Sequence, residues 1–443
     1  MKTKLLLFFL TLIYVQISFA QCWKTISAGN YHSIGIKNDG TMWSWGWNQY
    51  GQLGYGPFGF GNYNKGQVGS SNDWDSVSAN EDHTFAIKTD GTLWGWGYNN
   101  YGQLGNGNYN NQSSPVQIGT SNNWMKVSAG YYFGVAIKND GTLWAWGRND
   151  LYQLGTGDNI WTTEPIQIGT DNDWMDVDAG GSHCLALKNN GSLWAWGSNY
   201  FGTVGNGLSG FSVDVPSPIL INNGVWLKIE AAQNHSMAIK NDGTRWAWGS
   251  NYRGELGNGS NNDLVSPTQI GPENNWQDVS STSRFTIGLK NDGSIWMWGN
   301  FAYNPIQIGS ETNWSVISAG GYHVLALKNN DDLYGFYNNT YGQTGSNENT
   351  TNIFPPYQNN CPSSLSINET KFSKIKLYPN PTNGILNFDK IIDTVTLTTL
   401  DGKTIPITVV ENKIDISDLS KGIYLINIKD SDNNYFSDKI IKN

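Results

Sequence analysis

The sequence predicts an all-β fold, a seven-bladed β-propeller followed by a small antiparallel β-sandwich. The ten-residue stretch KNDGTLWAWG, 138–147, is one of seven related copies along the chain. All but the last interval between copies are about 50 residues, a period typical of solenoids and propellers. The 443 residues include 52 Gly and 21 Trp, with 14% charged residues, which indicates short strands joined by many turns.

The first 20 residues have the pattern of a secretory signal peptide. Lys2 and Lys4 form a positively charged start, an apolar run from Leu5 to Val15 follows, and Ser18-Phe19-Ala20 fits a cleavage site. The apolar run is too short to span a bilayer, and no other segment predicts a membrane span. We therefore expect residues 1–20 to be removed.

Each copy of the repeat predicts four short strands, the content of one propeller blade. In the copy that starts at Trp124, a first strand opens the repeat and a second covers 134–138. Asn-Asp-Gly then makes a tight turn, because Gly and Asx residues tolerate positive φ. A third strand carries Trp144 and Trp146 on one face of the pleat. A Gly-rich loop leads to a fourth strand at 165–169.

Seven Trp residues open the copies, so seven blades are predicted between residues 21 and 361. We expect the last strand of each repeat to pair with the opening strand of the next. The final one, 355–358, would then pair with Trp23–Ala28, which closes the ring and removes two exposed sheet edges. The opening residues are Trp23, Trp74, Trp124, Trp174, Trp226, Trp276 and Trp314.

The three cysteines fit this arrangement. Cys22 precedes the first blade strand and Cys361 follows the last, so ring closure would bring them together. An exported protein reaches a compartment that permits disulfides, and a Cys22–Cys361 bond is therefore expected. The chain-entropy model gives such a long loop a stabilisation of about 5 kcal/mol as an upper guide. Cys184 lies inside a repeat and is expected to be a small buried thiol.

The two residues before a recurrent His or Phe vary most among the copies, and we expect these turns to ring one mouth of the central channel. Variable turns on a repeated scaffold are a usual place for recognition; the alternative is that they vary as unconstrained surface. Trp47 and Trp161 lie off the template in inter-strand loops, where Trp is a common hot spot. The candidate binding residues are Tyr31, Trp47, Glu81, Asp82, Tyr131, Tyr132, Trp161, Asn234, Arg284 and Tyr322.

The sequence offers no set of catalytic or metal-binding residues. All five His occupy one repeat position, and the other two copies have Phe there, which indicates packing. The recurrent Asp residues of the Asp-Gly turns are explained by turn chemistry. Metal-binding and nucleophile motifs are absent, so we expect no metal, no cofactor and no enzymatic activity. The net charge of −9 argues against nucleic-acid binding, which needs a basic patch.

A second module follows the propeller. Residues 362–374 form a polar linker, and no Trp occurs after it. From 375 to 443 the chain has short β-rich runs with turns at Asp401-Gly402 and Lys421-Gly422. This pattern predicts a small antiparallel sandwich.

Both modules resemble known families. The repeat, with its pattern W-x-x-[VI]-S-A-G-x-x-H and K-x-D-G-T-L-W-x-W-G, resembles the regulator of chromosome condensation repeat family from Trp23 to about Gln358. That family forms seven-bladed propellers that act by binding. Its members include a nucleotide-exchange factor for a small GTPase, a plant ultraviolet-B receptor and a secreted inhibitor of β-lactamases.

The tail resembles the C-terminal sorting domain of the type IX secretion system of Bacteroidota. This resemblance implies that the type IX machinery exports the chain, which is then secreted or anchored to the outer surface of the outer membrane. The residues that match are Tyr378, Pro379, Asn380, Pro381, Gly384, Gly402, Gly422 and Tyr424.

The sequence therefore predicts a secreted or cell-surface, monomeric, non-catalytic propeller that recognises a protein partner through its inter-strand loops. A carbohydrate-binding surface protein is the alternative, because Trp and Tyr occur in polar, Asn-rich loops. A propeller-type lyase or hydrolase is the second alternative. Against it, Glu81 and Asp82 are the sole acidic cluster on the variable turns.

Overall fold

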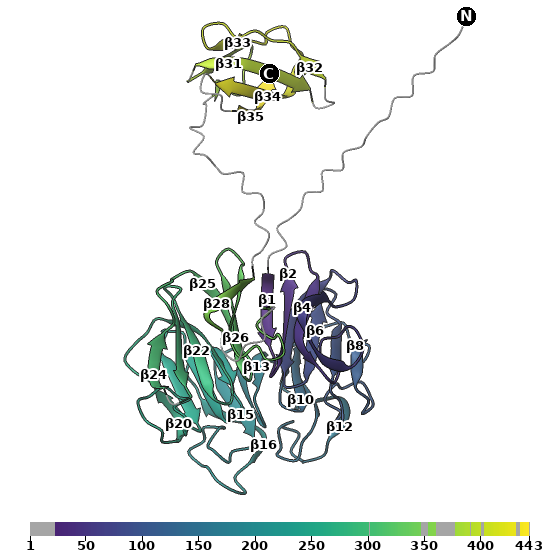
Figure 1. Cartoon of the computed structure of the whole chain (residues 1–443), viewed down its shortest axis with the longest axis vertical. Helices are drawn as coiled ribbons and strands as arrows, with labels where there is room; N and C mark the ends of the chain where they lie inside the picture. The colour runs from purple at the N-terminus through teal and green to yellow at the C-terminus, as the bar shows by residue number, and fades with distance from the viewer. Residues whose placement is uncertain are drawn as a thin grey trace, which may run out of the picture. The chain divides into compact units, whose positions relative to one another are not determined.

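A computed structural model describes residues 23–300, 302–346, 353–359, 377–389, 391–399, 403–430 and 435–442 (Figure 1). Every regular element in these ranges is a β-strand. The chain divides into two compact units, Met1–Ser364 and Leu365–Asn443. Residues 1–20, the linker 362–374 and the cysteines Cys22 and Cys361 lie outside the described residues, so the signal peptide and the disulfide stay predictions.

The first unit contains seven four-stranded antiparallel sheets, and each is formed by four strands that are consecutive in the sequence (Figure 1). The predicted seven-bladed propeller is confirmed. Blades 1 to 3 consist of β1 (Trp23–Ala28), β2 (His32–Lys37), β3 (Met42–Asn48) and β4 (Gly59–Gln67); β5 (Trp74–Asn80), β6 (His83–Lys88), β7 (Leu93–Gly97) and β8 (Gln112–Gln117); and β9 (Trp124–Ala129), β10 (Phe133–Lys138), β11 (Leu143–Gly147) and β12 (Thr162–Gln167).

The remaining four blades have the same strand order. They consist of β13 (Trp174–Ala179), β14 (His183–Lys188), β15 (Leu193–Gly197) and β16 (Val215–Asn222); β17 (Trp226–Ala231), β18 (His235–Lys240), β19 (Arg245–Gly249) and β20 (Leu264–Gln269); β21 (Trp276–Ser281), β22 (Phe285–Lys290), β23 (Ile295–Gly299) and β24 (Ala302–Gln307); and β25 (Trp314–Ala319), β26 (His323–Lys328), β27 (Leu333–Tyr337) and β28 (Ile353–Asn359).

The expected pairing of each fourth strand with the next repeat is wrong. β28 pairs with β27 in its own repeat, and β1 pairs with β2 alone. The physical reason is the position of the opening strands. Residues of β1 and its six equivalents line a central cavity, so their free edges face the axis of the ring. An additional strand on each of these edges would have to occupy the channel itself.

The ring closes by side-by-side packing of the last blade and the first. β1 packs against β25 and β26. The backbone N–H of Ala28 donates to Ser318 Oγ at 3.0 Å, and the indole N–H of Trp45 donates to the Gln343 carbonyl at 2.9 Å. Equivalent bonds join the other neighbouring blades, for example Trp196 to the Gln153 carbonyl at 3.0 Å. Closure therefore uses the ordinary contact between blades.

Tryptophan forms the core of each blade. In blade 3, the opening Trp124 and the second Trp of the pair, Trp146, are buried, and their rings lie 6.2 Å apart. Lys138 extends over Trp144, with Nζ 3.8 Å from the ring centroid. Other blades show the same lysine contact, which is a cation–π interaction that also caps the apolar layer.

The second unit is a small antiparallel β-structure with two sheets, as predicted. Its core contains Leu386, Leu397, Ile426 and Ile440. One sheet has the order β29-β30-β33 and the other β32-β31-β34-β35. The strands are β29 (Leu377–Tyr378), β30 (Ile385–Phe388), β31 (Ile392–Thr399), β32 (Thr404–Ile405), β33 (Lys413–Asp415), β34 (Gly422–Asp430) and β35 (Tyr435–Lys442).

The Tyr378–Pro381 motif of the tail lies against the last strand. The Asn380 side chain donates to the Lys439 carbonyl at 2.7 Å and accepts from the Ile441 N–H at 2.9 Å, as a neighbouring strand would. Tyr424 donates to the Ser420 carbonyl at 2.7 Å. A Cβ at Gly384 would lie 2.3 Å from Ser417 Oγ, which explains the glycine. Gly402 lies outside the described residues.

Candidate functional site: the mouth of the central cavity

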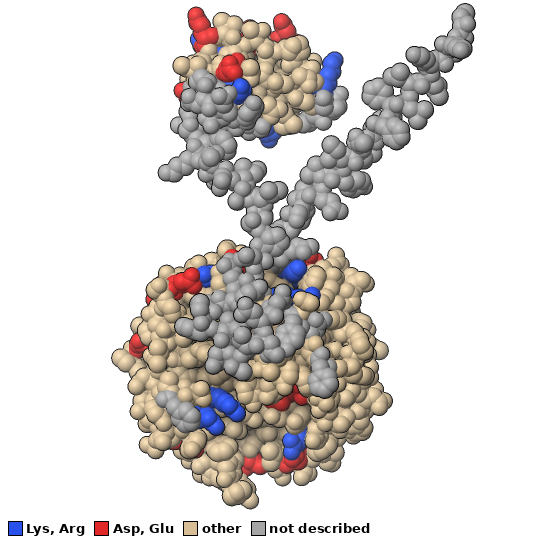
Figure 2. Space-filling view, viewed as in Figure 1, with Lys and Arg blue, Asp and Glu red and all other residues tan. Residues whose placement is uncertain are grey.

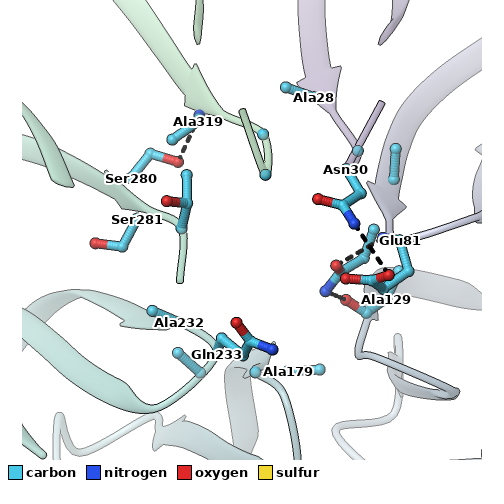
Figure 3. Close-up of a pocket in the computed structure, with 18 of the residues that line it drawn as sticks. Ala28, Asn30, Glu81, Ala129, Ala179, Ala232, Gln233, Ser280, Ser281 and Ala319 are labelled. Atoms are coloured by element: carbon cyan, nitrogen blue, oxygen red, sulfur yellow. Dashed lines mark hydrogen bonds between the residues drawn. The ribbon is translucent and has the colours of Figure 1, made fainter. Parts of the chain in front are cut away.

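A cavity of about 180 Å³ opens at the centre of the first unit (Figure 3). All seven blades contribute to its wall, through the ends of their inner strands and the turns that follow. The first residue of every variable turn lies in this wall, and the predicted turns are thus gathered around one mouth. These residues are Asn30, Glu81, Tyr131, Gly181, Gln233, Ser283 and Gly321.

Glu81 and Asp82 form an acidic turn at this mouth. Asn30 Nδ2 donates to Glu81 Oε2 at 3.1 Å, a bond visible in Figure 3, and Gln52 Nε2 donates to Asp82 Oδ1 at 2.9 Å. Burial, and then repulsion from Asp82, raise the pKa of Glu81 to about 8, although hydrogen bonds from Tyr131 and Asn30 act in the opposite direction. Burial raises the pKa of Asp82 to about 6. Both carboxyls are thus less acidic than in water.

Aromatic side chains gather on one sector of the same face, which blades 7, 1, 2 and 3 provide. Most are half-buried and contact one another. Tyr31 stacks on Tyr322 with ring centroids 4.7 Å apart, and Tyr101 lies 4.6 Å from Tyr132. We call this set the aromatic crescent: Tyr31, Trp47, Tyr50, Tyr98, Tyr101, Tyr131, Tyr132, Trp161, Tyr322 and Tyr341.

An arginine lies at each end of the aromatic crescent. The Arg284 guanidinium is 5.0 Å from the Tyr322 ring. The Arg148 guanidinium is 5.6 Å from the Tyr101 ring and is held by Asp150, whose Oδ2 accepts from Nη2 at 2.7 Å. Tyr rings and hydroxyl groups therefore lie beside the acidic turn, whereas the two cations lie at the ends of the aromatic crescent.

The predicted candidates differ in where they lie. Trp161 is 39% exposed in the loop before β12, as expected. Trp47, in contrast, is half-buried within β3 and packs 4.3 Å from Tyr341, so its placement in a loop is wrong. The third strand of blade 1 continues beyond the usual Gly and includes this residue. Asn234 belongs to the turn of blade 5, across the mouth from Glu81.

Two half-buried acids in the wall were missed. Five blades place a Ser here, whose oxygen accepts the backbone N–H of the next blade, as Ser78 does from Ala129 at 3.0 Å. Blades 4 and 5 use Asp178 and Glu230, which accept from Ala231 at 2.7 Å and from Ser281 at 2.6 Å. Alignment of the repeats would reveal both as departures from Ser. The serines are Ser27, Ser78, Ser128, Ser280 and Ser318.

Burial raises the pKa of both acids, and for Glu230 the repulsion from Asp178 adds to the effect. Two ion pairs lie on the inner strands, outside the residues that line the cavity. Lys126 pairs with Asp176, and Lys228 Nζ lies 3.0 Å from Asp278 Oδ1. The two ammonium groups also attract Asp178, which lowers its pKa in part.

The five histidines have a structural role between blades. His183 Nε2 lies 2.8 Å from Ser236 Oγ of the next blade, and His323 Nε2 lies 2.7 Å from Ser33 Oγ of blade 1. Burial lowers the pKa of each His to about 3, so the rings are neutral at physiological pH. Among the described residues, no group of His, Cys, Asp and Glu is suited to a metal ion.

Cys184 is fully buried, as expected for the thiol inside a repeat. Its Sγ donates to the Gln153 carbonyl at 3.5 Å, and burial raises the pKa of the thiol well above its ordinary value. Such a group is chemically inert. The described residues contain no helix long and apolar enough to cross a membrane.

Comparison with known proteins agrees with this architecture. Residues 11–225 match the family model of the RCC1-like domain, and residues 242–289 match the regulator of chromosome condensation (RCC1) repeat. The chain carries an RCC1-like domain. Residues 376–443 match the secretion system C-terminal sorting domain. The chain thus joins an RCC1-like propeller to a tail that supports secretion by the type IX system.

Curated relatives match over part of their length. The ultraviolet-B receptor UVR8 of Arabidopsis thaliana is 39% identical over 93 residues, which is 21% of this chain and 21% of that protein. The probable E3 ubiquitin-protein ligase HERC3 of Homo sapiens is 36% identical over 92 residues, 20% of this chain and 9% of that protein. The matched stretch is thus about a fifth or less of either relative.

Two solved structures share the fold of the RCC1-like domain. Human WBSCR16 superposes with a TM-score of 0.63 at 19% identity, covering 70% of this chain and 87% of that one. Prp20p of Saccharomyces cerevisiae superposes with a TM-score of 0.61 at 20% identity, covering 69% of this chain and 83% of that one. At these identities the likeness concerns the fold alone.

Proposed function

We propose that this protein is a secreted or cell-surface propeller that binds a protein partner, without catalysis, through the face that holds the cavity mouth and the aromatic crescent. The aromatic crescent carries the proposal. Ten Tyr and Trp side chains are concentrated over neighbouring blades of one face, and Tyr and Trp with flanking Arg are typical of protein-binding hot spots.

The burial of these rings favours a protein over a glycan. Most rings of the aromatic crescent are half-buried and packed edge-on or tilted against one another, so few present a free flat face. Trp161, at 39% exposure, is the ring best placed for stacking on a sugar. Carbohydrate binding therefore remains the second candidate, and Trp161 is the residue that would support it.

Enzymatic function has less support. Glu81 and Asp82 are adjacent on one turn, and each carboxyl already accepts a hydrogen bond from a neighbouring amide. Paired catalytic carboxyls act from opposite sides of a substrate bond, several ångströms apart.

The Prp20p structure is described with binding properties to Gsp1p and histones, and a binding role for this chain is in keeping with that.

Capture of the partner tests the proposal. The mature protein, with residues 1–20 removed, is immobilised and exposed to the proteins of its native surroundings, in parallel with a Tyr101→Ala/Tyr132→Ala variant. A matched control is Tyr252→Ala, because Tyr252 is 69% exposed on the loop of blade 5, outside the aromatic crescent. We expect the unmodified protein and the Tyr252→Ala control to capture a specific protein that the double variant does not capture.

Three outcomes would contradict the proposal. Equal capture by all forms would show that the aromatic crescent does not bind the partner. Binding to a glycan array that is lost in Trp161→Ala would favour the carbohydrate alternative. Turnover of a polysaccharide by the purified protein would establish an enzyme instead.

A further inference from the structure

We infer that the central cavity receives one basic side chain, a lysine or an arginine, presented by a loop of the bound protein, while the aromatic crescent packs against the rest of that loop. This inference rests on the proposed protein-binding function and specifies the chemistry of the partner. It follows from the charge, the size and the rim of the cavity.

The charge of the wall comes first. Its lining includes Glu81, Asp178 and Glu230 and no Lys or Arg. Lys126 and Lys228 do not line the cavity and already form ion pairs with Asp176 and Asp278. Carboxyls therefore outnumber cations in and next to the cavity wall, and a ligand with complementary charge is a cation.

The raised pKa values of these carboxyls indicate that the cavity would be stabilised by an added positive charge. Burial raises the pKa values of Glu81, Asp178 and Glu230, because a carboxylate that loses its contact with water is destabilised. The attraction of Lys126 and Lys228 for Asp178, and of Lys228 for Glu230, offsets this effect only in part. Asp82, Tyr31, Tyr131 and Tyr132 also face Glu81, and none of them supplies a positive charge. An entering ammonium or guanidinium would stabilise the ionised acids.

The size of the cavity selects one side chain. The cavity has a volume of about 180 Å³, which is many times the space that a single water molecule needs. One extended Lys or Arg side chain fits this volume, whereas a segment of folded chain does not. The cavity is open on one side, so a side chain can enter it from the face of the propeller.

The rim suits the same group. Tyr131 belongs both to the cavity wall and to the aromatic crescent, and it hydrogen-bonds Glu81. Tyr31 and Tyr322 stack on the other side of Asn30, which itself holds Glu81. Carboxyls and Tyr hydroxyls at this rim suit a cationic head group through charge-assisted contacts. The apolar stem of Lys or Arg would pack on the exposed parts of these half-buried rings.

Small probes test the inference on the mature protein without the partner. The probes are the Nα-acetyl methylamides of lysine, arginine and norleucine, of which the last has a similar stem and no charge. Binding is followed by ligand-observed nuclear magnetic resonance at pH 8. We expect the lysine probe, the arginine probe or both to bind about tenfold more tightly than the norleucine probe.

Two variants keep the test specific. Asp178→Ser/Glu230→Ser restores the residue of the other five blades, so the N–H groups of Ala231 and Ser281 keep an acceptor while the charges are removed. Glu81→Gln removes the charge at the mouth and is the second variant should the first unfold. We expect either to weaken the cationic probes by about tenfold. Glu164→Gln, exposed on the outer strand β12, is the matched control.

The inference would be overturned if the three probes bound equally, if none bound, or if the variants bound the cationic probes as the unmodified protein does. Thermal unfolding of each variant confirms that it is folded. Capture of a protein partner that needs the aromatic crescent, together with a failure of the probes, would refute the basic side chain and leave the proposed function standing.

Discussion

At the His position of the repeat, the choice between His and Phe depends on the residue that faces it from the next blade. His32, His183, His235 and His323 face a Ser or Thr hydroxyl there. Phe133 shares an apolar cluster with Cys184, and Phe285 shares one with Val324. His83 is the exception. The next blade has Gly134 at this position, which offers His83 no hydroxyl partner.

This correspondence predicts the effect of exchanging one pair type for the other. His183→Phe should destabilise the mature protein by about 1–3 kcal/mol, because the hydrogen bond to Ser236 is lost in a buried site. Ser236→Cys, which recreates the Phe133–Cys184 pair, should recover part of the loss in the double variant. Urea denaturation of the four forms gives the coupling energy. Additive effects would contradict the correspondence.

Arg245 is a buried cation in a position that other blades give to an apolar residue, such as Leu193 or Ile295. It is 2% exposed, and its guanidinium donates to the Leu256 and Gly257 carbonyls at 3.1 and 3.3 Å. Nε has no partner among the described residues. Burial lowers the pKa of Arg245 to about 9, so the charged form is destabilised by the fold.

We therefore expect Arg245→Leu to stabilise the RCC1-like domain by about 1–3 kcal/mol, since it replaces a buried charge with the apolar residue of the template. Thermal unfolding is the measurement, with Arg148→Leu as a control, because Arg148 is a half-buried surface cation. A lower midpoint for Arg245→Leu would show that stacking on Trp298 at 4.3 Å outweighs the cost of burial.

Glu81 predicts a pH dependence of stability. Its folded pKa of about 8 lies above the ordinary value of 4.5. Between these values the folded chain keeps a proton that the unfolded chain releases, so stability falls as pH rises from about 4.5 to about 8. Glu81→Gln removes this loss. Its advantage in unfolding free energy should be near zero at pH 4 and on the order of 1 kcal/mol at pH 8, given solvent screening. An advantage independent of pH would contradict the shift.

At the scale of the blade, the indole of the second Trp ties each blade to the loop of the previous one. Trp96 donates to the Gln52 carbonyl at 3.0 Å, and Trp298 donates to the Glu255 carbonyl at 2.8 Å. Blade 6 lacks this loop, because β23 ends at Gly299 and β24 begins at Ala302. Blade 7 correspondingly has Phe336, which needs no acceptor. The Phe that replaces the second Trp in the last repeat is thus explained by the missing loop of blade 6.

Phe336→Trp should therefore destabilise the protein by about 1–3 kcal/mol, because the added indole N–H has no loop carbonyl to bind in a buried site that is already filled. Trp196→Phe is the matched exchange in the opposite direction and should also destabilise, because the Gln153 carbonyl loses its donor. Unfolding in denaturant measures both. A stabilising Phe336→Trp would contradict the explanation.

The blades could be predicted from sequence because their signals are local. The Asn-Asp-Gly turns and the Trp pairs specify the inner hairpins without reference to the rest of the chain. The partner of the fourth strand could not be predicted, because it depends on the space left in the channel. The site was predicted in part. The variable turns marked the mouth, whereas Tyr50, Tyr98, Tyr101 and Tyr341 join the aromatic crescent only in the folded ring.

At the scale of the molecule, the chain is sparsely charged. Figure 2 shows uncharged residues over most of the visible, described surface of the first unit, with Lys, Arg, Asp and Glu scattered among them. The acids of the cavity wall are thus a local concentration on a largely neutral surface. The proposed basic side chain would therefore be recognised by these acids rather than by the overall charge of −9.

The way the ring closes predicts how it tolerates new termini. Because every sheet is complete within one repeat, a circular permutant of residues 23–359 that begins before Trp174, with a flexible linker joining the original ends, should keep its fold. A permutant opened at Asp140-Gly141 separates β10 from β11 and should be less stable. Circular dichroism and calorimetry compare them. Equal stability would contradict the independence of the blades.

The self-contained blade has a consequence for how such a chain can lengthen. Duplication of one repeat inserts a complete sheet and leaves no unpaired strand at either junction. Such a duplication therefore needs no compensating change in the strands of the other blades. The constraint on the number of units lies instead at the hub, where seven side-chain acceptors each serve the amide of the neighbouring blade. An eighth blade would have to widen this ring of acceptors, and the central cavity that a ligand would fill would widen with it.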